Sequence, residues 1–139
     1  MSSKIKSRKK IERPCTSCFT PQYLKFNFSY TENIHDLSIE YKAQILNMIL
    51  RLSSATYLTI LQRNKTIGVE IEDKEKLGLH KPYPANFVER FPVSQFNNKV
   101  AVARLYSNDN PILGRIIGVI IKNIFYVFFV DIGGKFYKH

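Results

Sequence analysis

The chain has 139 residues, the length of one domain, and 45% of them are hydrophobic, which excludes a disordered protein. It carries 21 Lys and Arg against 11 Asp and Glu, a net charge of +10. This charge favours a polyanionic partner such as RNA, the ribosome or a small acidic antitoxin-like protein; a basic protein without such a partner is the plain alternative.

The chain begins with a basic arm. Residues 1–13 contain six cations against the single acid Glu12, and no apolar run. We expect residues 1–20 to form a disordered tail ahead of a single domain at 21–139, and no apolar h-region follows that would indicate a secretory signal. We therefore expect a cytoplasmic protein. The cations that we expect to contact phosphates are Lys4, Lys6, Arg8, Lys9, Lys10 and Arg13.

Two cysteines follow the arm, Cys15 and Cys18, in a CxxC spacing that is typical of half a zinc site or of a redox pair. The sequence has no second CxxC, and its three histidines are scattered. We therefore expect two reduced thiols, no metal and no cofactor.

The first elements are a strand and a helix. Residues 23–30 alternate between apolar and polar, with four side chains expected to share one face, and this pattern predicts a half-buried strand: Leu24, Phe26, Phe28 and Tyr30. Residues 36–54 have apolar side chains at helical spacing, which predicts an amphipathic helix with Asp36 or Ser38 as its N-cap.

Shorter segments follow. Residues 55–64 predict a second helix behind Ser53 or Ser54, residues 66–73 a short strand, and residues 73–80 a helical turn. Residues 81–92 contain three prolines, and we expect no regular core element there.

The last 40 residues predict three strands, at 99–106, 113–121 and 124–132, with a hairpin turn at Lys122-Asn123. The third strand is apolar on both sides, so we expect it to be central, covered by the helices on one face and by residues 80–98 or a partner chain on the other. The predicted fold class is α+β, with two helices packed on a mostly antiparallel sheet that ends in a C-terminal β-meander. Arg115 and Lys122 interrupt the apolar run before it reaches the roughly 18 uncharged residues of a membrane helix.

Cationic side chains lie along this meander. If its strands are neighbours, Arg104 and Arg115 converge with the C-terminal residues at one rim of the sheet, where they would hold a phosphate. The plain alternative is that a strand-end arginine is solvated, or paired with an acid such as Asp131, and that the terminal His139 is frayed.

The pattern "ARL … GRIIGVI … FYVFFVDIGGKFYKH" resembles the C-terminal half of the RelE/ParE toxin superfamily. Members of the RelE type cut messenger RNA without a metal. The resemblance implies a phosphate clamp of Arg104, Arg115 and Lys135, with Tyr137 or His139 as the proton carrier. This sequence has Gly-Gly-Lys where the family has Gly-His-Arg, which puts the strongest basic group of the family pattern in doubt.

The function that we expect is therefore an RNA-targeting basic protein of bacterial or plasmid origin, with a metal-independent toxin-type endoribonuclease as its specific form. The alternative from another class is a non-catalytic module that binds nucleic acid or protein, encoded by a mobile element.

Overall fold

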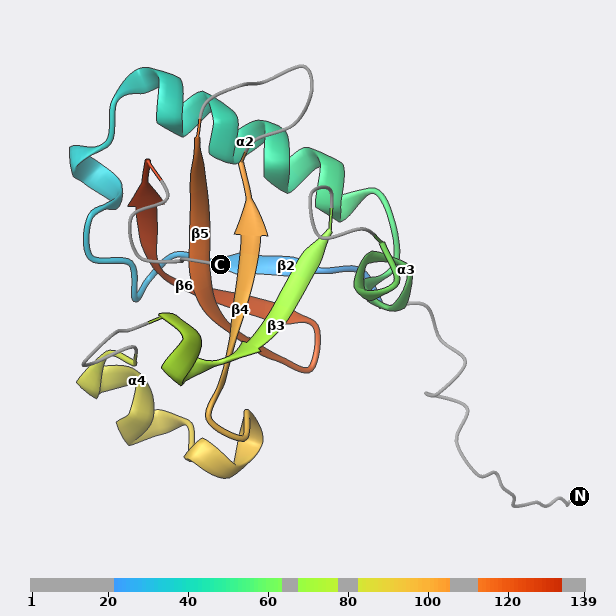
Figure 1. The fold of residues 1–139 in the computed structure, drawn as a ribbon, viewed down its shortest axis with the longest axis vertical. Coiled ribbons are helices and arrows are strands. Elements are labelled where there is room, and N and C mark those ends of the chain that lie inside the picture. Colours follow the sequence, from blue (N-terminus) through green and yellow to red (C-terminus); the bar gives the residue numbers. More distant parts are fainter. Residues whose placement is uncertain (1–21, 64–67, 78–82, 106–112, 134–139) are drawn as a thin grey trace, which may run out of the picture.

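The computed structural model describes residues 22–63, 68–77, 83–105 and 113–133, and we label its elements as in Figure 1. The basic tail at 1–20 lies outside the described residues. Five strands form one sheet in the order β2-β6-β5-β4-β3, which confirms the predicted α+β class. The strands are β2 (Lys25–Asn27), β3 (Val69–Asp73), β4 (Lys99–Arg104), β5 (Gly114–Ile121) and β6 (Ile124–Ile132). The α-helices of the described part are α2 (Ile39–Ser53), α3 (Tyr57–Leu61) and α4 (Ala85–Arg90).

The C-terminal meander forms as predicted, because β4, β5 and β6 pair antiparallel in chain order. Lys122 takes the left-handed conformation (φ 61°) in the two-residue turn between β5 and β6. The edges of the sheet come from earlier in the chain. Strand β3 pairs antiparallel with β4, whereas β2 pairs parallel with β6 and makes the sheet mixed.

Helix α2 crosses one face of the sheet (Figure 1). Ser38 is its N-cap, since its hydroxyl accepts a hydrogen bond from the backbone N–H of Tyr41. Asp36, the other predicted N-cap and the first residue of the predicted helix, instead ends a separate 3₁₀ turn of residues 34–36. The side chains at Ile45, Met48 and Leu52 are buried, as the 3.6-residue period requires.

The second helix is shorter than predicted, and its predicted caps were wrong. Ser53 is the last residue of α2, and Ser54 continues the helical conformation behind it. The N-cap of α3 is Thr56, whose hydroxyl accepts from the backbone N–H of Thr59.

The first strand is also shorter than the alternating pattern indicated. Leu24, Phe26 and Phe28 pack in the core beneath α2, as expected. Tyr30 was predicted on the same face, but it packs in the core cluster on the opposite side of the sheet. The backbone turns at Ser29 and Tyr30, which ends the alternation before its fourth member.

The proline-rich segment is the clearest correction. We expected no regular core element at 81–92, but α4 begins directly after Pro84, and its Phe87 is fully buried. A proline is tolerated at a helix start because the first N–H groups of a helix have no intrahelical partner. Residues 83–96 thereby cover the second face of the sheet, as predicted for residues 80–98, and form a core with Val119 and Phe128.

A β-bulge sets the sidedness of the last strand. Ile117 lies opposite Phe129 and Gly118 opposite Val127, so Phe128 is an extra residue in β6. Val127 packs on the α2 side, whereas Phe128 and Phe129 both pack on the α4 side. The alternation that resumes after the bulge therefore brings Asp131 to the α4 side of the sheet.

Candidate functional site

Three charged residues form a row across the meander. Arg104 on β4 lies opposite Arg115 on β5, and Arg115 lies opposite Asp131 on β6. All three follow the alternation of the strands on the α4 side, because Val102 and Ile117, two residues away, pack in the core there. The sequence prediction that the two arginines converge at one end of the sheet is therefore confirmed for this pair.

The centre of the row is an internal ion pair. The Arg115 Nη1 atom lies 4.0 Å from the Asp131 Oδ2 atom, and the two side chains are 10% and 0% exposed. A buried guanidinium that faces a buried carboxylate has its charge balanced inside the protein. Arg115 therefore matches the plain alternative from the sequence, a strand-end arginine paired with Asp131, better than an open phosphate clamp.

An acidic residue also borders the other end of the row. Glu70 on β3 lies opposite Val102, two residues before Arg104 on the same side of β4. Side chains at such diagonal positions are within reach of each other when they are long. The register thus places an acid, two arginines and an acid across four neighbouring strands, and their formal charges sum to zero.

Arg51 of α2 approaches the same end of β4 from the other face. Its Nη2 atom donates a hydrogen bond to the backbone carbonyl of Arg104 at 3.3 Å. Burial and the neighbouring charge of Arg63 lower the pKa of Arg51. This contact joins α2 to the sheet beside the charged row, and no local sequence pattern predicted it.

The other predicted site residues lie outside the described residues. They are Lys4, Lys6, Arg8, Lys9, Lys10 and Arg13 in the tail, and Lys135, Tyr137 and His139 at the C-terminus. The chain leaves the sheet beside the charged row, since Gly133 donates a backbone hydrogen bond to Leu113 at 3.0 Å. The last three of these residues follow within six positions of that point.

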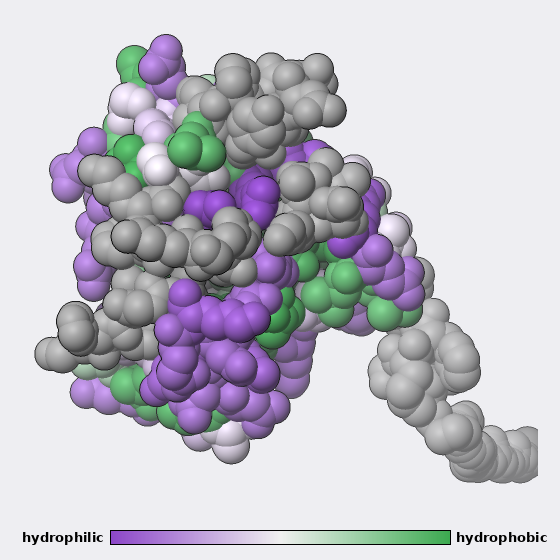
Figure 2. Space-filling view, viewed as in Figure 1, coloured by the Kyte–Doolittle hydropathy of each residue, from purple (hydrophilic) through white to green (hydrophobic). Residues whose placement is uncertain are grey.

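The positive charge is unevenly distributed between the residues that the structure describes and the rest of the chain. The described residues contain eleven Lys and Arg against nine Asp and Glu, a net charge of +2, while the whole chain carries +10. Most of the excess therefore belongs to the remaining segments, above all to residues 1–21. In Figure 2, hydrophilic side chains cover much of the visible face, and a hydrophobic patch lies over α3, where Leu58 and Leu61 are exposed.

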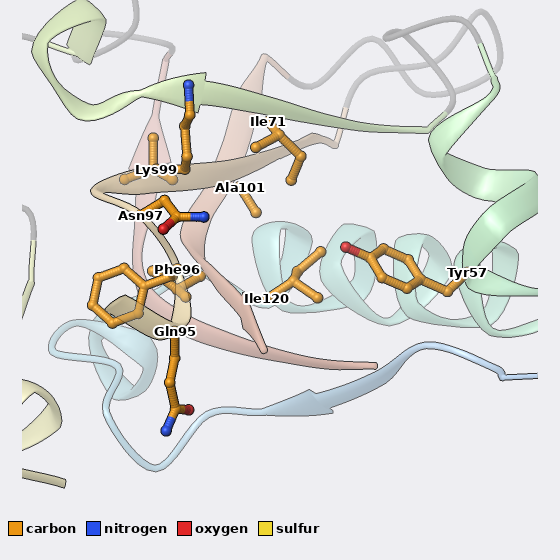
Figure 3. A pocket seen from close by; sticks show the side chains of 10 residues that line it. Tyr57, Ile71, Gln95, Phe96, Asn97, Lys99, Ala101 and Ile120 are labelled. Atoms are coloured by element: carbon orange, nitrogen blue, oxygen red, sulfur yellow. The ribbon is translucent and has the colours of Figure 1, made fainter. Parts of the chain in front are cut away.

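A second site was not foreseen from the sequence. A pocket of about 220 Å³ lies on the α2 side of the sheet, between α3 and the turn that leads into β4 (Figure 3). Tyr57 and Asn97 stand at its two ends. The Asn97-Asn98 pair is a sequence signal for a turn at this point of the chain. That Tyr57 lines the same pocket depends on tertiary structure, which no local pattern predicts.

Among the described residues, no group of three or more His, Cys, Asp or Glu side chains is placed to hold a metal ion. No helix within those same ranges has the length and apolar character needed to cross a membrane. No family model, curated protein or solved structure matched the chain. The resemblance to the RelE/ParE superfamily therefore rests on the sequence pattern alone.

Proposed function

We propose that the protein is an RNA-binding protein in which the basic tail contacts phosphates and the α+β domain serves as its scaffold. The observation that carries this proposal is the location of the charge. Residues 1–13 carry a net charge of +5 within 13 positions, whereas residues 14–139 carry the other +5 over 126 positions, and the arginine at the centre of the charged row faces a buried carboxylate. The six cations of residues 1–13 have one acid among them, so little negative charge within that segment offsets their attraction for a polyanion.

This arrangement predicts a steep dependence of RNA affinity on salt. Each phosphate contact to a single strand releases counterions, and the slope of log K against log salt falls by about 0.7 per contact. If all six tail cations contact RNA, their replacement by Gln removes about four units of slope. A matched control replaces exposed cations of the domain: Lys25, Lys42 and Lys122.

The measurement is fluorescence anisotropy with a labelled single-stranded RNA between 50 and 300 mM salt, with a DNA duplex as competitor. We expect the tail variant to lose most of the slope and the domain variant to keep it. Equal slopes in parent and tail variant would show that the tail does not contact phosphate. Preference for the duplex would identify DNA as the ligand instead.

A toxin-type endoribonuclease is the second candidate, and one observation favours it. Like charges directly opposite each other on neighbouring strands destabilise a sheet, yet Arg104 lies opposite Arg115. The pair lies at the end from which the chain continues to Tyr137. In the reaction that the resemblance implies, the 2′-hydroxyl attacks the adjacent phosphate, a base takes its proton, and an acid protonates the leaving 5′-oxygen.

Cleavage is tested by incubating labelled RNA with the protein in the presence of EDTA, and by inducing expression in growing cells. Under the endoribonuclease candidate, Arg104→Gln and Tyr137→Phe abolish both product formation and growth inhibition. Arg115→Ala is less informative, because it leaves Asp131 buried opposite an apolar side chain. If the parent protein binds RNA in a salt-dependent manner but leaves the RNA intact, the endoribonuclease candidate is rejected and the RNA-binding function stands.

A further inference from the structure

The pocket of Figure 3 has an apolar floor built by three neighbouring strands. Ile71, Ala101 and Ile120 come from β3, β4 and β5, and all three project to the α2 side of the sheet. Because these three side chains project from one face of adjacent strands, the floor of the pocket follows the surface of the sheet. A volume of about 220 Å³ is below the roughly 300–1,000 Å³ of sites for drug-sized ligands, so the pocket suits a compact molecule.

A phenol closes one end of the pocket. In Figure 3 the Tyr57 hydroxyl points toward Ile120, across the floor. Tyr57 is the first residue of α3, and its backbone N–H donates to the Gln22 carbonyl at 2.7 Å, which fixes the helix start against the segment before β2. A tyrosine hydroxyl is protonated at neutral pH and can donate a hydrogen bond. Burial raises the pKa of Tyr57 further from that ordinary value.

A carboxamide stands at the opposite end. Asn97 lies in the turn before β4 with φ 53°, a left-handed conformation that Asn tolerates better than most residues. Figure 3 shows its side-chain amide directed toward Ala101, whereas Gln95 and Lys99 point away from the floor. Within the described ranges, neither the Asn97 carboxamide nor the Tyr57 hydroxyl has a hydrogen bond to another protein group.

We propose that this pocket binds the base of an unpaired nucleotide. A base is a compact planar ring whose faces suit an apolar floor, while its edge carries both donors and acceptors. The carboxamide of Asn97 also offers one donor group and one acceptor, the combination by which Asn recognises adenine edges. A hydrocarbon chain would leave both polar ends unpaired, and a sugar would place its hydroxyls against the isoleucines.

The inference rests on the proposed RNA binding, because an unpaired base is what single-stranded RNA presents to a protein. It adds a contact of a different kind. The tail contacts are electrostatic and independent of sequence, whereas a base held by hydrogen bonds at its edge gives a preference among nucleotides. The adenine-type edge is the one that the Asn97 carboxamide matches best.

The chain supplies matched variants for the test. Asn97→Gly removes the carboxamide at a left-handed position that glycine adopts without strain. Asn98→Gly is its control, because Asn98 has the same left-handed conformation (φ 58°) and does not line the pocket. Tyr57→Phe removes only the hydroxyl, and Tyr23→Phe does the same at a side chain that is 49% exposed.

The experiment titrates the ¹⁵N-labelled full chain with adenosine monophosphate and, as a ligand without a base, with ribose 5-phosphate. We expect adenosine monophosphate alone to shift the Asn97 side-chain amide signals. Affinity should fall about five- to tenfold in Asn97→Gly and in Tyr57→Phe, the effect of one lost hydrogen bond, and remain unchanged in the two controls.

The outcomes separate this inference from the proposed function. Salt-dependent RNA binding without any Asn97 shift would overturn the base site and leave the tail function standing. Asn97 shifts in a protein that does not bind RNA would support the pocket as a site for free nucleotides and reject the RNA function. Equal shifts with ribose 5-phosphate, or equal affinities of Asn97→Gly and the parent, would overturn recognition of the base.

Discussion

Arg115 of β5 lies directly opposite Asp131 of β6, with 4.0 Å between the Nη1 and Oδ2 atoms and both side chains nearly inaccessible to water. The pair joins the two longest strands of the described sheet at the end where the chain leaves it. Removal of one partner leaves a buried charge without compensation, whereas replacement of both by apolar side chains of similar volume is often neutral.

Asp131→Asn is therefore predicted to lower the free energy of unfolding by about 3 kcal/mol, as measured by urea denaturation. The double variant Arg115→Met/Asp131→Leu should recover most of this loss. Asp73→Asn is the exposed control, since its ion pair with Lys99 has both side chains about half exposed, and its effect should be small. Equal losses in Asp131→Asn and Asp73→Asn would contradict the buried character of the pair.

The second prediction concerns the cover that α4 provides. Phe87 is fully buried and stacks against Phe91 with ring centroids 4.7 Å apart. Phe87→Ala should lower the free energy of unfolding by about 3–5 kcal/mol, because it removes a whole aromatic side chain from a packed core. Val88→Ala, one position along and 38% exposed, should cost far less. Similar losses in the two variants would mean that α4 does not cover the sheet.

The sequence predicted the meander well because its strands carry local signals. Alternation, β-branched residues and a Lys-Asn turn define β5 and β6 without reference to the rest of the chain. The nearness of Arg104 and Arg115 was expected from chain order, because the end of one strand and the start of the next lie side by side if the strands are neighbours in a meander. The presence of Asp131 opposite Arg115 was one of two open alternatives, because its sidedness depends on the bulge at Phe128.

The errors arose where tertiary contacts decide the structure. Because of its prolines, the segment around Pro84 was predicted to contain no regular element. Pro84, however, precedes the first residue of α4, where a helix tolerates proline, and the buried ring of Phe87 stabilises this short helix. The parallel pairing of β2 with β6 joins segments about 100 residues apart, which no local pattern predicts. The pocket between Tyr57 and Asn97 was missed for the same reason.

The third prediction tests the bulge that brings Asp131 to the α4 side. A side chain at Gly118 would collide with the backbone carbonyl of Tyr126, which cannot move without loss of the strand pairing. Gly118→Ala should lower the free energy of unfolding by about 3 kcal/mol or more. At Gly114 a Cβ atom would lie 3.0 Å from the Tyr41 ring and 3.3 Å from the backbone carbonyl of Asp131, which is tight but far less close than at Gly118, so Gly114→Ala should be milder. The order of the two losses in urea denaturation is the check, and the reverse order would contradict the bulge geometry.

The fourth prediction concerns alkaline pH and Tyr83, which joins the residues before α4 to β4. Its hydroxyl donates to the Lys99 carbonyl at 3.2 Å, and burial together with the charge of Glu75 raises the pKa of Tyr83 to about 12. In the unfolded chain the pKa of tyrosine is about 10. Between about pH 10 and 12 the unfolded state loses this proton while the folded state keeps it, so the free energy of unfolding falls as the pH rises. Below about pH 10 both states are protonated, and Tyr83 contributes no pH dependence.

Tyr83→Phe should therefore flatten the decline of the melting temperature between about pH 10 and 11.5. The comparison uses slopes, because the variant also loses the hydrogen bond to Lys99 and is expected to be less stable at every pH. Tyr23→Phe, which removes a tyrosine hydroxyl at an exposed position outside this contact, serves as the control for the substitution itself. If Tyr83→Phe also declines in parallel with the parent, the Tyr83 hydroxyl of the parent titrates at the same pH in the folded and unfolded chains, and the raised pKa is contradicted.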